Sequence, residues 1–371
     1  MELEDPVNDP ATRRFFGLEP QRVLEAVDGA GLRPTGRFQQ LNSLENRVFS
    51  VEVEPGLPIQ EPAHGSVDQL DPDQPLERVV VKIYRPGRWR PEQIQAEHRF
   101  LTDLGEAGFP VALPLPLDAQ GSTLGQTDGM CHAVWPALAG RIPDEFSDSM
   151  LRRFGGLLAR LHELGARRAA PERATLDADY LVRRPLSFLE RSGLVHPQVW
   201  QRYRHAAQAA AAALDRCLDG LPVHRIHGDC HRGNLLACGD ELHFLDFDDF
   251  VTGPAVQDIW MIAPAQDAEG MRQRAVMLSA YRQVRPFDEA WLEAVNPLKA
   301  GRYIHYAAWI ARRWADPAFP AAFPQFGDLE YWETETRDLE QLIERGFAPE
   351  VVEEQGYAET EDYSKLTNKD Y

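Results

Sequence analysis

The sequence is poor in three features that mark particular classes of protein: cysteine pairs, long apolar runs and positive charge. Its 371 residues include only 4 cysteines and no Cys-x-x-Cys pair, which argues against a disulfide-stapled domain. No apolar run approaches the ~18 residues of a membrane-spanning helix. Lysine plus arginine number 39 against 58 aspartate plus glutamate, a formal charge of -19, which argues against a nucleic-acid-binding surface.

Two further absences bear on where the protein works. The first residues, Met-Glu-Leu-Glu-Asp-Pro, lack the basic and apolar regions of a secretory signal peptide. Together with the unpaired cysteines, this predicts a reducing, cytoplasmic setting without membrane or nucleic-acid partners, and we also expect a monomer. Because the net charge is so negative, an anionic ligand would need a local basic site or a metal ion.

The residues that are present are those of a folded protein. Hydrophobic residues make up 43% and charged residues 26% of the chain, which is inside the globular range. At about 150 residues per domain, the length allows two lobes. The apolar periodicity is strand-like before residue 136 and helical after residue 140, with no internal repeat. This change of period predicts an α+β fold.

The first lobe, residues 1–135, is predicted to be a small sheet with accompanying helices. Its β-branched runs are separated by Gly, Pro and Asp, a pattern typical of strands and turns. A hinge is predicted at 136–140, between the two lobes. We expect helices at 19–30 and 91–104, strands at 36–42, 47–53, 78–84 and within 115–136, a hairpin turn at Asp128-Gly129, and an exposed loop at 54–76.

Two charged residues of this lobe occupy positions where apolar side chains are expected. Lys82 lies mid-strand among valines, and Glu97 lies on the inward stripe of the helix that begins at Pro91. A buried lysine and a buried carboxylate each need a partner, so we predict that the two pair. The alternatives are an edge-strand lysine that discourages aggregation and a partly exposed glutamate, with Glu92 as the substitute partner.

The second lobe, residues 141–349, is predicted to be mostly helical, with helices at 151–161, 199–218 and 289–314. Short apolar segments, Val223–Ile226 and His243–Phe247, flank a polar loop at 227–234. This arrangement suggests a hairpin-like loop carried by a helical scaffold. Residues 350–371 are polar and acidic, and we expect a disordered tail there.

The densest group of reactive side chains is His-Gly-Asp-Cys-His-Arg-Gly-Asn at 227–234, followed by Leu-Asp-Phe-Asp-Asp at 245–249. A zinc site is one interpretation, because His227 and His231 are four apart, but glycine stands where the H-E-x-x-H motif has glutamate. A tight turn capped by Asp229 is another. The third is a Mg²⁺-nucleotide site, because aspartates and asparagine supply the oxygen ligands that hard cations prefer.

His227-Gly-Asp-x-x-x-x-Asn234 and Leu245-Asp246 resemble the motifs of the aminoglycoside phosphotransferase and choline kinase superfamily, whose fold is bilobal and protein-kinase-like. Five blocks also resemble bacterial stress response kinases of that superfamily, over roughly residues 20 to 345: Leu41–Val48, Val81–Trp89, His227–His231, Gly253–Trp260 and Arg312–Pro320.

The resemblance implies an activity. The protein would use ATP and Mg²⁺ to transfer the γ-phosphoryl group to a hydroxyl, in the first place a serine or threonine of a protein substrate in a stress response. A small-molecule kinase acting on an amino alcohol, a sugar or an aminoglycoside is the alternative, because the same loop serves all these acceptors. A catalytically dead pseudokinase that works as a binding module is the third hypothesis.

The resemblance also implies roles for individual residues. Asp229 matches the catalytic aspartate that orients or deprotonates the acceptor hydroxyl. Asn234 and Asp246 match the two Mg²⁺ ligands, and Asp246 is counted among the catalytic residues for that reason. Lys82 matches the lysine that contacts the α and β phosphates, and Glu97 matches the helix carboxylate that pairs with it. These five residues form the predicted core of the site.

The segment from Gln40 to Phe49 contains no glycine, so no glycine-rich loop can cradle phosphates with bare backbone. The resemblance implies that the Ser43 hydroxyl contacts the phosphates instead, with Asn42 or Asn46 as further amide donors. Capping of a turn by Asn42 and Ser43 is the alternative.

Four other features are expected to support or extend the site. By resemblance, Asp258 braces the catalytic loop by accepting backbone N–H bonds, and His227 braces it rather than acting as a base. Asp248 is either a further ion contact or a surface charge. The Arg312-Arg313-Trp314 block either fixes helices against each other or binds an acidic group.

Overall fold

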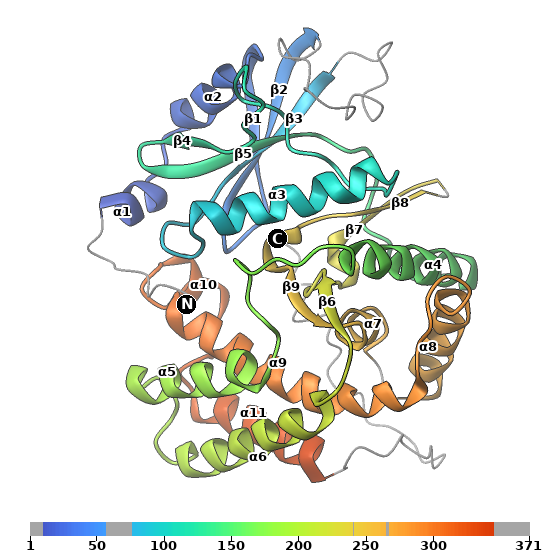
Figure 1. The fold of residues 1–371 in the computed structure, drawn as a ribbon. Helices are drawn as coiled ribbons and strands as arrows, with labels where there is room; N and C mark the ends of the chain where they lie inside the picture. Colours follow the sequence, from blue (N-terminus) through green and yellow to red (C-terminus); the bar gives the residue numbers. More distant parts are fainter. Residues whose placement is uncertain (1–9, 57–75, 240, 265–266, 345–371) are drawn as a thin grey trace. The chain divides into compact units, whose positions relative to one another are not determined.

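The computed structural model describes residues 10–56, 76–239, 241–264 and 267–344 (Figure 1). The chain falls into two compact units. The first is the described part of Met1–Ile142 together with Leu235–Asp248, and the second is Pro143–Asn234 together with the described residues after Asp248. The lobe limits given above stay a prediction. The predicted tail at 350–371 and most of the predicted loop at 54–76 lie outside the described residues.

The first unit is built on a five-stranded antiparallel sheet with the strand order β1-β2-β3-β5-β4. Strand β3 has a neighbour on each side, so the interpretation of Lys82 as an edge-strand lysine is wrong. Asp128 and Gly129 connect β4 to β5 with φ of 52° and 79°, which confirms the predicted hairpin turn. The elements are α1 (Pro10–Phe16), α2 (Pro20–Gly29), β1 (Pro34–Leu41), β2 (Arg47–Gly56), β3 (Leu76–Ile83), α3 (Pro91–Glu106), β4 (Gly125–Thr127) and β5 (Met130–Pro136).

Helices cover both faces of this sheet. Val79 and Val81 of β3 belong to an apolar cluster that includes buried residues of α2. On the other face, Tyr84 packs against Ile94 of α3, the helix that runs along the sheet in Figure 1. The predicted two-faced character of β3 is therefore confirmed, and alternation places Lys82 on the α3 side.

A short hairpin, β7 (Leu235–Cys238) and β8 (Glu241–Phe244), completes the first unit. It is joined to the rest of that unit by isolated bridges from Phe244 to Val111 and from Ala237 to Arg141. Phe247, just beyond β8, packs edge-on against Phe100 of α3 at 5.8 Å between ring centroids. The hairpin thus delivers residues 246–248 to the first unit.

The second unit is mostly helical, as predicted, and α9 packs against α5, α6 and α11 (Figure 1). Its small sheet pairs β6 with β9, so the predicted hairpin between 223–226 and 243–247 is wrong. The helix predicted at 289–314 begins later than expected, because residues 289–294 form a 3-10 turn before α9. The elements are α4 (Asp148–Gly165), a π-helix (Asp179–Arg183), α5 (Arg184–Ser192), α6 (Trp200–Leu218), β6 (Val223–Ile226), β9 (Val251–Pro254), α7 (Val256–Ile262), α8 (Ala268–Tyr281), the 3-10 turn (Glu289–Ala294), α9 (Val295–Arg312), α10 (Ala318–Ala322) and α11 (Leu329–Glu344).

No helix within the described ranges has both the length and the apolar character needed to span a membrane.

Candidate functional site

Lys82 of β3 is the centre of a buried ionic cluster in the first unit. Its Nζ lies 2.7 Å from Asp248 Oδ1, 2.9 Å from Asp246 Oδ1 and 4.0 Å from Glu97 Oε1. Lys82 is 9% exposed and Glu97 1% exposed, so the interpretation of Glu97 as a partly exposed residue is wrong. Glu92 is exposed and pairs with Arg90 instead. The predicted pair is present, but the two aspartates are the closer partners.

The cluster keeps Lys82 charged. Burial alone would lower the pKa of this lysine, but Asp246, Asp248 and Glu97 outweigh burial and hold the pKa well above its ordinary value. The same balance acts on Asp248, where burial would raise the pKa but Lys82 and Arg88 lower it. The charged ammonium group therefore faces three carboxylates.

The two aspartates that follow β8 differ in exposure. The side chain of Asp246 is 50% exposed, and its φ of 55° is a left-handed conformation that is uncommon for a residue other than glycine. Asp248 is buried and also accepts a hydrogen bond from Asn46 Nδ2 at 2.5 Å. The interpretation of Asp248 as a surface charge is therefore wrong, and its pairing with Lys82 is a contact that the sequence does not predict.

The glycine-free loop before β2 is held from within the first unit. Ser43 Oγ accepts a hydrogen bond from the Asn46 N–H at 3.2 Å, the turn-capping arrangement. Asn46 is buried, and its Oδ1 accepts from the backbone N–H of Arg85. The amide of Asn46 is therefore occupied by Arg85 and Asp248, two residues of the same unit, and links the loop to them. Contact of Ser43 with phosphate stays a prediction.

A hydrogen-bonded chain lies behind Glu97. Tyr84 Oη donates to Glu97 Oε2 at 3.4 Å and lies 3.2 Å from His98 Nε2, while His98 Nδ1 lies 2.7 Å from Thr123 Oγ1. Burial, followed by Lys82, lowers the pKa of His98 to about 3, so this histidine is neutral near pH 7. Sequence alone gave no signal for this chain beyond the alternation that places Tyr84 on the face of Lys82.

In the second unit the predicted catalytic loop turns sharply after β6. Gly228 has a φ of +82°, and a Cβ at this position would lie 2.4 Å from the backbone oxygen of Asp249, so only glycine fits. Asp258 of α7 accepts hydrogen bonds from the N–H groups of His227 and Gly228, both at 2.8 Å. His227 Nδ1 in turn accepts from the Asp229 N–H at 3.4 Å. The bracing roles predicted for Asp258 and His227 are confirmed.

Asp229 follows Gly228 in this loop and contacts two basic side chains. Arg302 Nη2 of α9 donates to Asp229 Oδ1 at 2.5 Å, and His231 Nε2 lies 3.5 Å from Asp229 Oδ2. Burial would raise the pKa of Asp229, but Arg302, His231 and His227 hold it well below its ordinary value. Asp229 is therefore ionised at neutral pH. The contact with Arg302, 73 residues away in sequence, was not predicted.

Asn234, one of the two predicted Mg²⁺ ligands, is held by its own loop. Its Nδ2 donates to the backbone oxygen of Asp229 at 2.9 Å, and no donor within the described residues binds its Oδ1. The side-chain oxygen of Asn234 in the second unit and the half-exposed carboxylate of Asp246 in the first are each a donor of the type that Mg²⁺ prefers, so each residue taken by itself fits the predicted metal. In the part of the chain that the structure describes, no group of three His, Cys, Asp or Glu could hold a metal ion, which leaves the zinc interpretation without support.

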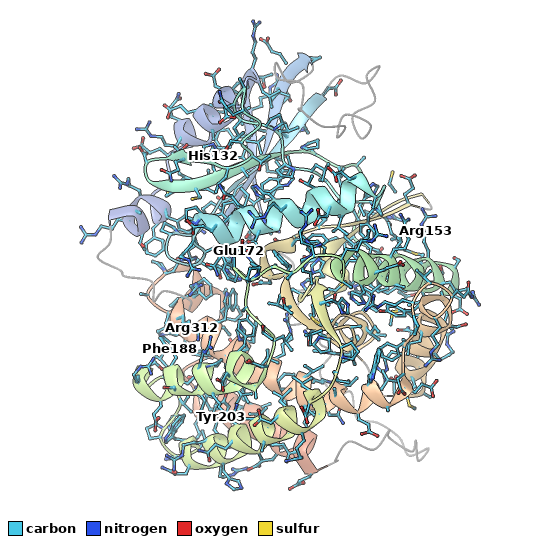
Figure 2. The ribbon with its side chains drawn as sticks, in the orientation of Figure 1. His132, Arg153, Glu172, Phe188, Tyr203 and Arg312 are labelled. Carbon is cyan, nitrogen blue, oxygen red and sulfur yellow. The ribbon has the colours of Figure 1, made fainter. Side chains whose placement is uncertain are left out.

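The Arg312-Arg313-Trp314 block takes part in helix packing. The Arg312 guanidinium lies 5.2 Å from the centroid of the Phe188 ring of α5. The two residues are labelled next to each other in Figure 2. Arg313 is 1% exposed, and Trp314 packs against Phe326 at 5.1 Å. These contacts favour the interpretation that the block fixes helices against each other.

Comparisons with known proteins give a consistent family. A model described as "Phosphotransferase enzyme family" matches residues 59–295. Stress response kinase A of Salmonella paratyphi A is 34% identical over 324 residues, which cover 87% of this chain and 92% of that protein. The serine/threonine protein kinase RdoA of Salmonella typhimurium is 33% identical over the same shares of the two chains, and stress response kinase A of Escherichia coli K12 is 33% identical over 323 residues.

Solved structures resemble most of the chain. Amicoumacin kinase hAmiN, in complex with AMP-PNP, Ca²⁺ and Ami, has a TM-score of 0.64 at 18% identity and covers 89% of this chain and 95% of its own. The microcompartment-associated aminopropanol kinase has a TM-score of 0.57 at 18% identity, with 86% and 98% covered. The predicted α+β, kinase-like fold, with a sheet-rich N-terminal and a helical C-terminal region, is confirmed.

Proposed function

Because the chain belongs to the phosphotransferase enzyme family, we propose that it is a kinase of a stress response that transfers the γ-phosphoryl group of ATP to serine or threonine hydroxyls of proteins. The observation that carries the choice of acceptor is the 33% identity over 324 residues to a relative named as a serine/threonine protein kinase. The neighbours named for small-molecule acceptors share the fold at 18% identity, too distant to bear on the acceptor.

Lys82 is the proposed partner of the ATP phosphates. Neighbouring carboxylates keep it charged despite its burial, and two of them, Asp248 and Glu97, are themselves buried. Asp246 is the half-exposed partner, so it is the one that a phosphate would replace on Lys82. Ser43 is proposed to contact the phosphates through its hydroxyl hydrogen.

Asp229 is the proposed catalytic aspartate. Its depressed pKa keeps the carboxylate ionised, so it can orient the attacking hydroxyl and receive its proton. Asn234 and Asp246 would hold Mg²⁺, in line with the AMP-PNP and Ca²⁺ bound by hAmiN. A bound divalent ion would offset the negative charge that develops on the transferred phosphoryl group.

The proposal is tested with γ-labelled ATP, Mg²⁺ and a lysate of the source cell, resolved for both protein and small-molecule products. We expect labelled proteins, and we expect Asp229→Asn to reduce the labelling by about 10²–10⁴-fold while the melting temperature shifts by only a few degrees. Asp179→Asn, which removes an exposed carboxylate of the same unit, should label as wild type. Labelling by Asp229→Asn at the wild-type rate would contradict the role of Asp229. Label found only in small molecules would favour the small-molecule kinase.

A further inference from the structure

Of the two basic side chains that contact the proposed catalytic carboxylate, His231 and Arg302, the closer is Arg302. Its Nη2 lies 2.5 Å from Asp229 Oδ1, and the side chains of Arg302 and Asp229 are 31% and 22% exposed. Within the described residues, Arg302 makes no other hydrogen bond or ion pair. A guanidinium has five N–H donors, so most of those of Arg302 remain available to a ligand that approaches Asp229.

The helix that carries Arg302 is unusual in this chain. Aspartate and glutamate outnumber lysine and arginine by 58 to 39 overall, yet α9 has no acidic residue in its 18 positions. Its charged side chains are those of Lys299, Arg302 and Arg312, with His305 in addition. The helix next to the catalytic carboxylate therefore offers positive charge only.

We propose that Arg302 determines which acceptors are phosphorylated, by favouring a hydroxyl that has an anionic group close by and disfavouring one that has an ammonium group. For a protein acceptor, this means a serine or threonine flanked by aspartate or glutamate. The proposal rests on the proposed function, because it takes Asp229 as the residue that receives the acceptor hydroxyl.

The physical reason is distance. A hydroxyl bonded to Asp229 has to lie about 2.5–3.0 Å from a carboxylate oxygen, so the groups attached to it come within a few ångströms of the Arg302 guanidinium. A carboxylate there can accept N–H bonds from the planar guanidinium, often two at once. An ammonium group in the same place would be repelled, and this repulsion is strong where water is partly excluded.

A purely structural role for Arg302 makes a different prediction. If the guanidinium only balances the charge of Asp229, its removal should slow all acceptors by the same factor. If the guanidinium instead interacts with the charge of the acceptor, its removal should change the ratio of the rates at which acidic and basic acceptors are phosphorylated. The ratio of kcat/KM values for acidic and basic acceptors therefore separates the two roles.

The test uses three synthetic peptides of equal length, each with one serine flanked by glutamate, by alanine or by lysine, at fixed ionic strength. For the full-length protein we expect kcat/KM to be at least about tenfold higher for the glutamate than for the lysine peptide, since like-charge contacts cost several kcal/mol. Arg302→Gln should bring this ratio to within about threefold, and Arg302→Lys, which keeps the charge, should retain most of it. Arg312→Gln, which removes the same charge from α9 at the Phe188 ring, should leave the ratio unchanged.

Each outcome decides between the two proposals. An equal or reversed preference in the wild type, or an unchanged ratio in Arg302→Gln, overturns the role of Arg302 and leaves the protein-kinase proposal standing. If no peptide is labelled but small alcohols are, the protein-kinase proposal fails, and the charge ratio is measured between a hydroxy acid and an amino alcohol. If neither set of acceptors is labelled, both proposals are refuted.

Discussion

Replacing Lys82 by methionine is the sharpest test of the buried cluster, because it keeps most of the side-chain volume and removes the charge. In the wild type the ammonium group faces Asp248 at 2.7 Å, Asp246 at 2.9 Å and Glu97 at 4.0 Å. Removing one partner of a buried ion pair costs about 3–5 kcal/mol, because the remaining charge is left uncompensated. At about pH 8 we expect the free energy of unfolding of Lys82→Met to fall by that amount, which corresponds to a decrease on the order of 5–10 °C in melting temperature.

The loss of stability in Lys82→Met should depend on pH, and the protonation of Asp248 determines whether the loss grows or shrinks as the pH rises. Lys82 holds the pKa of this buried aspartate below its ordinary value, so the pair stabilises the fold above about pH 4 and loses its effect as the pH falls below that. Without Lys82, Asp248 loses the strongest of the interactions that oppose burial, while Arg88 and Asn46 remain, so its pKa should rise and its ionisation should stabilise the fold less as the pH rises. The difference between wild type and Lys82→Met should therefore be larger at about pH 8 than at about pH 5.

The assay is urea unfolding followed by tryptophan fluorescence at both pH values, on four proteins. Adding Asp248→Asn to Lys82→Met should recover about 1–3 kcal/mol of the loss, since it removes the orphaned charge. Arg33→Met serves as the matched control. Its pair with Glu54 is 3.6 Å long and largely exposed, so it should cost under about 1 kcal/mol. A Lys82→Met protein as stable as wild type at both pH values, or a double variant less stable than Lys82→Met, would refute the reasoning.

Three other substitutions have defined outcomes. Gly228→Ala should destabilise the fold by more than about 1 kcal/mol and impair labelling, because φ is +82° and a backbone oxygen lies 2.4 Å from the added Cβ. Gly156→Ala is the control: its added Cβ lies in open space on α4, so it should be neutral or stabilising. Thermal unfolding compares the stability of the two variants. Tyr84→Phe removes the bond to Glu97 and should raise the KM for ATP by about fivefold, the equivalent of about 1 kcal/mol, in steady-state kinetics. Burial raises the pKa of Glu335 to about 8, so the folded state keeps a proton that the unfolded chain loses above about pH 4. Glu335→Gln should therefore raise the melting temperature, and by more at about pH 8 than at about pH 5 in calorimetry.

The half of the site that could be predicted is the half whose residues break a local pattern. Lys82 stands in a β-branched run and Glu97 on an apolar helix stripe, and each exception requires a partner when the position is buried. Period-2 and period-3.6 spacing place both residues on inward faces without any knowledge of tertiary structure. The structure confirms the pairing, and it also confirms the bracing of the loop by Asp258, which rested on resemblance to a family.

Asp248 could not be assigned in the same way, because what it contacts depends on a strand pairing that local periodicity does not specify. The apolar segments at 223–226 and 243–247 flank one loop and look like the two arms of a hairpin. In the structure β6 pairs with β9, and β8 pairs with β7 and joins the first unit. Strand pairing depends on the packing of the whole unit. The sequence therefore does not decide whether Asp248 is an ion contact or a surface charge, whereas the strand pairing in the structure does.

Arg302 shows a different limit of sequence reasoning. An arginine on an amphipathic helix is most often a solvated side chain, and nothing within one turn of Arg302 distinguishes it from Lys299 or Arg312 on the same helix. What distinguishes it is a carboxylate 73 residues earlier, held in place by a loop that turns at Gly228 and is braced by α7. The one signal in the sequence is regional rather than local: an acidic chain contains an 18-residue helix with no acidic residue. A helix whose charge is opposite to that of the rest of the chain is a good place to look for a charged ligand. On α9, Arg302 is the residue that we expect to interact with the charge of the acceptor.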